Sequence, residues 1–388
     1  MANFRRAWRV RLLHITTYYP GVLSSIYDRN PGLATANFAG QMSALFALRF
    51  GWSDVWREAL RPLGYEVEEI VANADCAQKQ WWLEFGKKGG RPADPADVVL
   101  EQARTFQPDI IFLDDYAFFP STFPNRLREA AGGCRCVAGW CGAPIHDPAI
   151  FKNFDVVFSN IPHVSEDFRA QGILSWHLDH AFDGRLAEEI PLAPMSEDLL
   201  FTGSLFPGSQ FHNRRLEILG ALAERFPLVV HGELPPQQEN WKDLLTRKLR
   251  ISSRASQRAA LDRCIRPSVY GRNMYERLGV ARIALNIHID EANGQASNMR
   301  LFEATGMGAC VLTDGKNGME RIFDDGHELV VFDSMEDCLS RVAWLLDHPD
   351  EAYRIGRNGR ARTLRDHTFG HRAVTMDRLL VQAMKGKN

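Results

Sequence analysis

Short apolar runs alternate with amphipathic segments along most of the chain. Apolar runs of about four to eight residues between helix-period segments are typical of β-α-β units around a parallel sheet. The first series of runs covers residues 10–16, 67–72, 109–113, 134–139, 156–159 and 173–177. A second series covers residues 198–202, 228–231, 268–270, 283–288, 310–313 and 329–332. The pattern predicts the α/β class, with two Rossmann-like, doubly wound domains.

The stretch between the two series has no sustained periodicity. It runs over residues 182–196 and contains Gly184, Pro191 and Pro194, which favour a linker. We therefore expect the domain boundary near residue 190. After residue 349 the apolar positions return at helical spacing, which predicts terminal helices. The expected parts are an N-terminal domain over 1–190, a C-terminal domain over 191–365, and a helix over 366–388 that packs on either domain.

Length and charge narrow the range of functions. At about 150 residues per domain, a chain of 388 residues is long enough for two cores. The formal net charge is -2, so no global field draws the protein to nucleic acid or to an anionic membrane. The arginines of residues 247–277 are not interleaved with aromatic stacking residues, which also argues against nucleic-acid binding. An anionic ligand would have to be held locally.

The ends and the cysteines point to the cytoplasm. The N-terminal arginines are followed only by Leu12 and Leu13 before His14, which is too short for a signal peptide. No segment approaches the roughly 18 apolar residues of a membrane span. The seven cysteines are an odd number, which fits reduced thiols better than a disulfide framework. The spacing of Cys134, Cys136, Cys141 and His146 is not that of a common zinc module, so we expect no metal site there.

Two common phosphate-binding sequence motifs are absent from the chain. The chain contains neither G-x-G-x-x-G nor G-x-x-x-x-G-K-[ST]. Gly306-Met307-Gly308 comes nearest, but it follows a predicted helix and lacks the third glycine. A dinucleotide cofactor and a P-loop are therefore not predicted.

Residues 297–314 carry the most informative pattern. Ser297 or Asn298 can cap a helix that continues through Met299 and Arg300 and ends at a glycine before a strand. Glu303 lies inside this short helix, where a carboxylate would ordinarily face solvent. If it faces a cleft instead, it can accept hydrogen bonds from a ribose diol, while the helix start offers N–H groups to a phosphate.

These residues resemble the donor-site helix of the group 1 glycosyltransferases, and the whole chain resembles the CgeB-like branch of that superfamily. Besides SNMRLFEATGMGACVLTD at 297–314, the likeness lies in HITTYYP at 14–20, GWSDVWREALRPLGYEVEEIVAN at 51–73, SNIPHVSEDFRAQGI at 159–173, HAFD at 180–183, FTGSL at 201–205, YGRNMYERLGVARIALNIHID at 270–290 and HTFGHR at 367–372. It covers nearly the full chain.

The resemblance implies a GT-B fold, in which two Rossmann-like domains face a central cleft and no metal is required. It also implies a nucleoside diphosphate sugar as substrate, with no cofactor, and transfer to a hydroxyl of a glycan, lipid-linked sugar, protein or small molecule. Glu303 matches the family's second glutamate, which holds the donor ribose. The first glutamate falls on Gln295, which is neutral. Retention or inversion of the anomeric centre therefore stays open.

Other donor contacts are expected in the C-terminal domain. Gly203 and Ser204 follow its first strand, where a glycine lets backbone N–H groups approach a diphosphate. Arg214 and Arg215 on the next helix could neutralise phosphate charge, although surface arginines on helices are common. Tyr270 and Gly271 lie where related enzymes pass the nucleobase, and Met274 or Tyr275 could be core.

The N-terminal domain should supply the acceptor site and any catalytic base. His14, Asp115, His146 and His163 lie at or near predicted strand ends, where doubly wound sheets place their clefts. His163 is the first candidate because its surroundings are part of the family likeness. Asp115 is the second, since the adjoining Asp114 could raise its pKa. The aromatic residues that suggest an acceptor platform are Tyr18, Tyr19, Tyr27, Phe38, Trp81 and Trp82.

Other functions fit parts of the same pattern. A sugar-nucleotide epimerase or phosphorylase would share the donor site without an extended acceptor surface. A non-catalytic module that binds a sugar nucleotide, or assembles on spores or cell-surface machinery, is kept open by Gln295. Peripheral membrane contact is also open, and donor hydrolysis would separate an enzyme from a module.

Overall fold

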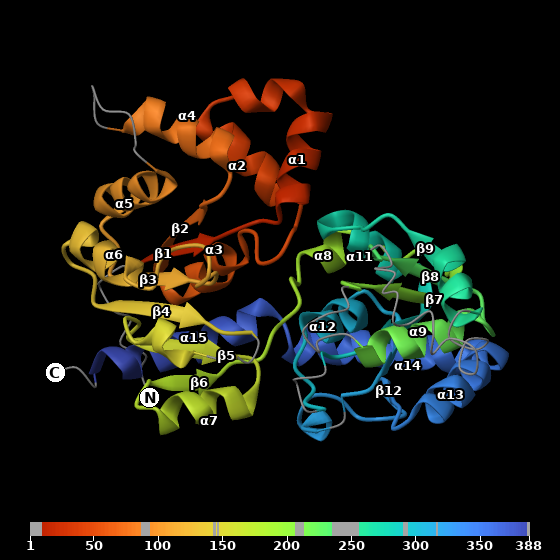
Figure 1. The fold of residues 1–388 in the computed structure, drawn as a ribbon. Coiled ribbons are helices and arrows are strands. Elements are labelled where there is room, and N and C mark those ends of the chain that lie inside the picture. The colour runs from red at the N-terminus through yellow and green to blue at the C-terminus, as the bar shows by residue number, and fades with distance from the viewer. Residues whose placement is uncertain are drawn as a thin grey trace, which may run out of the picture. The chain divides into compact units, whose positions relative to one another are not determined.

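The computed structural model describes residues 10–86, 94–142, 145, 147–205, 213–234, 256–289, 294–315 and 317–385. The chain divides into two compact units. The N-terminal unit comprises the residues up to Asp179 together with those from Phe369 onward, and the C-terminal unit is His180–Thr368. Figure 1 shows both units, each with a sheet between helices.

The N-terminal unit contains one parallel sheet of six strands in the order β2-β1-β3-β4-β5-β6. Its strands are β1 (Val10–Thr16), β2 (Tyr65–Val71), β3 (Ile110–Leu113), β4 (Cys136–Trp140), β5 (Val156–Ser159) and β6 (Ser175–His177). Strands β3, β4 and β5 are buried along their whole length, because helices cover both faces of such a sheet. The strand order reverses between β1 and β3, which is the topological switch point where doubly wound sheets bind ligands.

The helices of this unit are α1 (Pro20–Arg29), α2 (Phe38–Ala47), α3 (Val55–Leu60), α4 (Asp75–Phe85), α5 (Pro95–Phe106), α6 (Phe123–Ala131), α7 (Pro162–Ala170) and α15 (Phe369–Lys385). Short 3₁₀ turns lie at η1 (Pro31–Thr35), η2 (Arg61–Leu63) and η3 (Pro148–Phe151). In α5 the side chain of Asp94 caps the helix and Pro95 follows at the first helical position, as the sequence favours.

The last helix, α15, belongs to the N-terminal unit. The ring centroids of Trp56 and Phe369 lie 5.2 Å apart. Tyr65 on β2 donates a hydrogen bond of 2.6 Å from its hydroxyl to Asp377. Figure 1 shows this blue helix beside the yellow strand β4. The sequence did not predict which domain this helix packs on, and these contacts show that it packs on the N-terminal unit.

The C-terminal unit also contains six parallel strands, in the order β12-β11-β10-β7-β8-β9. They are β7 (Glu197–Thr202), β8 (Leu228–His231), β9 (Ile265–Arg266), β10 (Ala281–Asn286), β11 (Cys310–Thr313) and β12 (Val330–Val331). Its helices are α8 (Leu186–Glu189), α9 (Asn213–Ala223), α11 (Gly271–Gly279), α12 (Met299–Gly306), α13 (Met335–Asp347), α14 (Pro349–Asp366) and the 3₁₀ turn η5 (Met319–Arg321). The switch point lies between β7 and β10.

The prediction of two α/β domains with parallel sheets is confirmed, and two details differ. The strand expected at 268–270 is wrong: β9 is Ile265–Arg266, and Tyr270 is already the cap of α11. The chain divides after Asp179, before the boundary expected near residue 190, because Phe182, Leu186 and Ile190 are buried in the core of the C-terminal unit. Within the described residues, no helix combines the length and apolarity that crossing a membrane requires.

Candidate functional site

Two neighbouring strands end at the switch point of the C-terminal sheet and are tied together by a buried arginine. The guanidinium of Arg215 donates hydrogen bonds to the carbonyl oxygens of Ser204 (2.7 Å) and Ile287 (2.6 Å), which follow β7 and β10. The guanidinium carbon Cζ of Arg215 also lies 5.5 Å from the centre of the Phe201 ring. Arg215 therefore holds the strand ends in place, a structural role that sequence alone did not separate from phosphate binding.

The neighbouring Arg214 is directed toward Asp314 and the solvent. The Arg214 side chain is 47% exposed, and its Nη1 lies 3.7 Å from Oδ2 of Asp314 at the end of β11. Of the two adjacent arginines, Arg214 is thus the one whose charge remains accessible to a ligand. Gly203 and Ser204, the other residues predicted beside it, lie at the end of β7, and Ser204 is exposed.

The start of α12 is anchored to the same strand ends by a chain of amide and hydroxyl groups. Asn298 caps the helix by accepting a hydrogen bond from the backbone N–H of Leu301 at 3.2 Å. Its Nδ2 donates to Oδ1 of Asn286 at 2.7 Å, and Asn286 in turn donates to the hydroxyl of Thr313 at 2.9 Å. The unsatisfied N–H groups of the first helical turn are therefore held beside the switch point, where they can meet an anion.

A buried histidine and a buried aspartate, neither of them predicted from the sequence, complete this network. His288 donates from both its backbone N–H and its Nδ1 to Oδ1 of Asp314, each at 2.9 Å. The backbone N–H of Ser297 donates to Nε2 of His288 at 3.2 Å, so the ring carries its proton on Nδ1. A Cβ at Gly315 would overlap the ring, which explains the glycine after Asp314.

The charge of Asp314 is stabilised within this network. Burial raises the pKa of Asp314, but the hydrogen bonds from His288 and the charge of Arg214 outweigh burial and hold that pKa below its ordinary value. Asp314 is therefore ionised at neutral pH and orients both His288 and Arg214. Polar residues at the two strand ends were the signal that could have found this pair: His288 is the last residue of the run at 283–288, and Asp314 directly follows the run at 310–313.

Glu303 is buried. The expectation that a carboxylate inside this short helix faces solvent is therefore wrong. The hydroxyl of Tyr275 donates to its Oε1 at 2.9 Å, and the guanidinium of Arg300 donates to its Oε2 at 2.6 Å. Burial and the neighbouring carboxylate raise the pKa of Tyr275 well above its ordinary value, so the phenol stays a proton donor. Met274 and Tyr275 are both core residues, only 5% and 4% exposed.

The remaining predicted donor residues lie at helix starts. Tyr270 caps α11 in an extended conformation and is 41% exposed, and Gly271 after it has a φ of 54°, which glycine adopts without strain. Met299 and Arg300 are half-buried in the first turn of α12. Gln295 forms an isolated β-bridge with Asn317.

At the switch point of the N-terminal sheet, Asp115 is bound to the loop after β1. The hydroxyl of Thr17 donates to Oδ2 of Asp115 at 2.5 Å, and the backbone N–H of Ala117 donates to Oδ1 at 3.1 Å. Asp115 itself is half-buried. It lies at the position expected for a group that approaches a ligand at the ends of β1 and β3.

His14 lies within β1 and has no exposed surface. Its Nε2 donates to Oδ2 of Asp114 at 3.2 Å, and its Nδ1 lies 3.6 Å from Oε1 of Glu69. Its ring also stacks on Phe112, with centroids 5.3 Å apart. Burial lowers the pKa of His14, but the two carboxylates outweigh burial and raise it to about 9. His14 is thus a buried cation that cannot touch a substrate directly.

His163 lies apart from Asp115 along the sheet. It is a half-buried residue in the first turn of α7, directly after β5, and β4 separates β5 from β3. Two strand spacings of about 4.8 Å put about 10 Å between the two strand ends. The structure therefore does not combine His163 and Asp115 in one cluster, and His146 lies outside the described residues.

Comparison with known proteins shows a likeness to one family over part of the chain, and a fold over nearly all of it. Residues 214–378 match the model of a family described as glycosyl transferase-like. No curated protein matches the chain. Among solved structures, a sucrose-phosphate synthase from Thermosynechococcus elongatus is 13% identical with a TM-score of 0.56, covering 97% of this chain and 100% of its own.

Two further structures agree. A glycosyltransferase from Rickettsia africae is 11% identical with a TM-score of 0.56, over 97% of this chain and 99% of its own. HepE from Anabaena, in complex with UDP and glucose, is 13% identical with a TM-score of 0.55, over 96% of this chain and 100% of its own. At such identities the likeness shows the fold, which is that of the GT-B glycosyltransferases.

Proposed function

We propose that the protein transfers a sugar from a nucleoside diphosphate sugar to a hydroxyl acceptor, and that the donor binds at the switch point of the C-terminal sheet. The observation that carries this proposal is the set of polar groups there, with Arg214 accessible and the start of α12 tied to β10 through Asn298. These groups lie within the residues that match the glycosyl transferase-like family. The complex of HepE with UDP and glucose supports a nucleotide sugar as the donor.

The leaving diphosphate carries the charge that such a site must stabilise. The first-turn N–H groups of α12 and the guanidinium of Arg214 are both suited to that task. Because Asn298 and Asp314 already fix these two groups, little reorganisation is needed during the reaction. In the loop after β7, the backbone N–H of Gly203 already donates to the carbonyl oxygen of His231 at 3.2 Å, so the backbone N–H of Ser204 would be the one that this loop adds.

Glu303 is our proposed ribose ligand, as the family resemblance implies. An ionised carboxylate has about four lone-pair sites, and Tyr275 and Arg300 occupy one on each oxygen. The remaining sites can accept the two hydroxyls of a ribose. Tyr270 and Gly271 would then border the nucleobase.

The acceptor would bind in the N-terminal unit and meet its base there. Asp115 is the first candidate for the base because it lies at the β1/β3 switch point, and His163 after β5 is the second. His14 would act through Asp114 and Glu69 as a positioning residue, since it has no exposed surface. We also propose that the reaction needs no metal and that the chain belongs to the CgeB-like branch and works in the cytoplasm.

A panel of nucleotide sugars tests this proposal, with slow donor hydrolysis and release of the nucleoside diphosphate as readouts. We expect one donor to be hydrolysed, and Arg214→Ala to reduce its turnover by about tenfold or more through loss of a charge-assisted contact. Arg225→Ala, an exposed change on the same unit, is the matched control and should have no effect.

Binding without turnover would instead support a non-catalytic sugar-nucleotide module, the alternative that the neutral Gln295 keeps open. Interconversion of the donor sugar would support an epimerase. A chain that neither binds nor turns over any member of the panel would contradict the proposal.

A further inference from the structure

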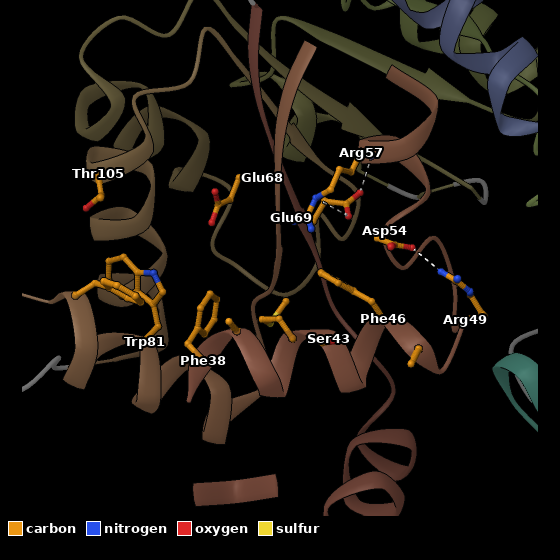
Figure 2. Close-up of a pocket in the computed structure, with 14 residues that line it drawn as sticks. Phe38, Ser43, Phe46, Arg49, Asp54, Arg57, Glu68, Glu69, Trp81 and Thr105 are labelled. Carbon is orange, nitrogen blue, oxygen red and sulfur yellow. Dashed lines mark hydrogen bonds and ion pairs between the residues drawn. The ribbon is translucent and has the colours of Figure 1, made fainter. Parts of the chain in front are cut away.

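The N-terminal unit contains a cavity of about 690 Å³ beside its edge strand. The cavity lies between helices α2 and α4, strand β2, and Thr105 near the C-terminal end of α5. Figure 2 shows its lining residues. Glu68 and Glu69 both line it, although consecutive residues of a strand point to opposite faces. The cavity therefore wraps around the free edge of β2, and none of its residues belongs to the C-terminal unit.

One end of this cavity is aromatic. Phe38 of α2 and Trp81 and Phe85 of α4 line it, and the ring centroids of Trp81 and Phe85 lie 5.9 Å apart. Trp81 is nearly buried, while Phe85 is 58% exposed. Phe38 and Trp81 are two of the residues that the sequence suggested as a platform for a ligand. Aromatic faces of this kind attract cations as well as apolar groups.

The charges at the other end are paired with one another, and Oε1 of Glu69 also lies 3.6 Å from Nδ1 of His14. Nη1 of Arg49 donates to Oδ1 of Asp54 at 2.9 Å. Nε of Arg57 lies 4.0 Å from Oε2 of Glu69, and the backbone N–H of Arg57 donates to Oε1 at 3.2 Å. These groups leave no net charge for a ligand at this end.

Glu68 differs from these carboxylates. Within the part of the chain that the structure describes, it makes no hydrogen bond and no ion pair. In Figure 2 it lies on the side of the cavity where Phe38, Trp81 and Thr105 are drawn. Burial raises the pKa of Glu68, with the charges of Arg57 and Arg11 acting against it. The lining thus carries one more carboxylate than guanidinium, and the excess charge faces aromatic rings.

We propose that this cavity binds an organic cation, with an ammonium group at Glu68 and an apolar body against Phe38 and Trp81. An ammonium neutralises the carboxylate through charge-assisted hydrogen bonds and gains from the aromatic faces at the same time. A neutral sugar would stack on the rings but would leave the charge of Glu68 uncompensated. An anion would be repelled.

Three isosteric probes test this assignment by calorimetric titration into the full-length protein without any nucleotide: hexylammonium, hexanol and hexanoate. Hexylammonium should bind at least about tenfold more tightly than hexanol, and hexanoate should not bind. Glu68→Gln should remove that preference. Glu66→Gln makes the same change of charge two residues away on β2, at a side chain that is 45% exposed, and should leave binding unchanged.

A second variant keeps the test decisive if Glu68→Gln destabilises the unit. Ser43→Leu on the exposed face of α2 narrows the cavity without changing its charge, and it should weaken hexylammonium by about tenfold. Equal binding of hexanol and hexylammonium, or full binding by both variants, would overturn the proposal. So would methyl glucoside binding that Glu68→Gln leaves intact. Donor hydrolysis is measured separately, so failure here does not count against sugar transfer.

Discussion

The two sheets have the same number of parallel strands but use polar groups at their switch points in different ways. In the C-terminal unit, amide and hydroxyl side chains link the ends of β10 and β11 to the start of α12. In the N-terminal unit, the corresponding region holds a buried histidine cation between two carboxylates. The first arrangement leaves helix N–H groups and Arg214 available to an anion, whereas the second uses its charges internally.

This difference supports our proposal that the donor binds in the C-terminal unit. Fixing a helix start with neutral amides preserves its positive end for a ligand. A charged cluster that is already neutralised gains little from a second anion. At the N-terminal switch point, the half-buried Asp115 is a hydrogen-bond acceptor suited to a hydroxyl.

The largest expected effect concerns the base. Asp115→Asn should lower transfer turnover by at least about a hundredfold, because general-base catalysis contributes on that scale. Donor affinity should be unaltered, since Asp115 lies in the other unit. Steady-state kinetics and calorimetric donor titration measure the two quantities.

His163→Ala, made in parallel, decides between the two candidates. A hundredfold loss in this variant alone would move the base from the switch point to the end of β5. Near wild-type turnover in both variants would contradict an inverting mechanism with either residue as the base.

Glu303→Ala should have the next largest effect. Loss of two hydrogen bonds to a ribose should weaken nucleotide binding by about tenfold to a hundredfold. It should also lower the free energy of unfolding by about 1–3 kcal/mol, because Tyr275 and Arg300 lose their acceptor in a buried place. Calorimetry and denaturant unfolding separate the two losses.

The matched control is Glu276→Gln on the neighbouring helix α11, where the carboxylate is exposed and pairs with Arg272. It should leave both quantities unchanged. A Glu303→Ala protein that unfolds easily but binds nucleotide normally would make Glu303 a structural residue only.

The buried cation of the N-terminal unit predicts a smaller effect, on stability against pH. The pKa of His14 rises from 6.5 to about 9 on folding, so its contribution is fully present below pH 6.5 and is lost as pH rises through 9. The raised pKa of Glu69 acts in the same direction. Denaturant unfolding should show stability falling by up to about 3 kcal/mol over this window.

His14→Gln should flatten that dependence, whereas His163→Gln in the same unit should preserve it. A stability that rises between pH 6.5 and 9 would contradict the charged state of His14.

The smallest expected effect is that of a chelator. Turnover should be unchanged by EDTA, because Arg214 and the N–H groups of α12 supply the positive charge that a metal would otherwise bring. Turnover that disappears with EDTA and returns with manganese would show that these groups are insufficient.

Local signals in the sequence predicted the sheets and one helix start. Apolar runs between helical segments identified the strands, and Ser297 or Asn298 was expected to cap α12, where the structure has Asn298. β9 was misplaced because two residues, Ile265–Arg266, give almost no periodic signal.

The partners of each ionisable group could not be predicted. Glu303 is held by Tyr275, 28 positions away in sequence, and His14 by Asp114, 100 positions away. Such contacts depend on which strands are neighbours in the sheet, and no local pattern encodes that order. The same holds for the division after Asp179, which depends on where Phe182 and Leu186 pack.

Hydrogen exchange with and without a nucleoside diphosphate tests the central claim most directly, because it locates the bound nucleotide in the full-length chain. We expect that UDP, or the nucleoside diphosphate of the preferred donor, slows exchange in residues 297–306 at the start of α12 and in residues 213–223 around Arg214. Arg214→Ala should weaken that protection, while Arg225→Ala should preserve it. Protection confined to the N-terminal unit, or no protection with any nucleoside diphosphate at millimolar concentration, would contradict the assignment of the donor site.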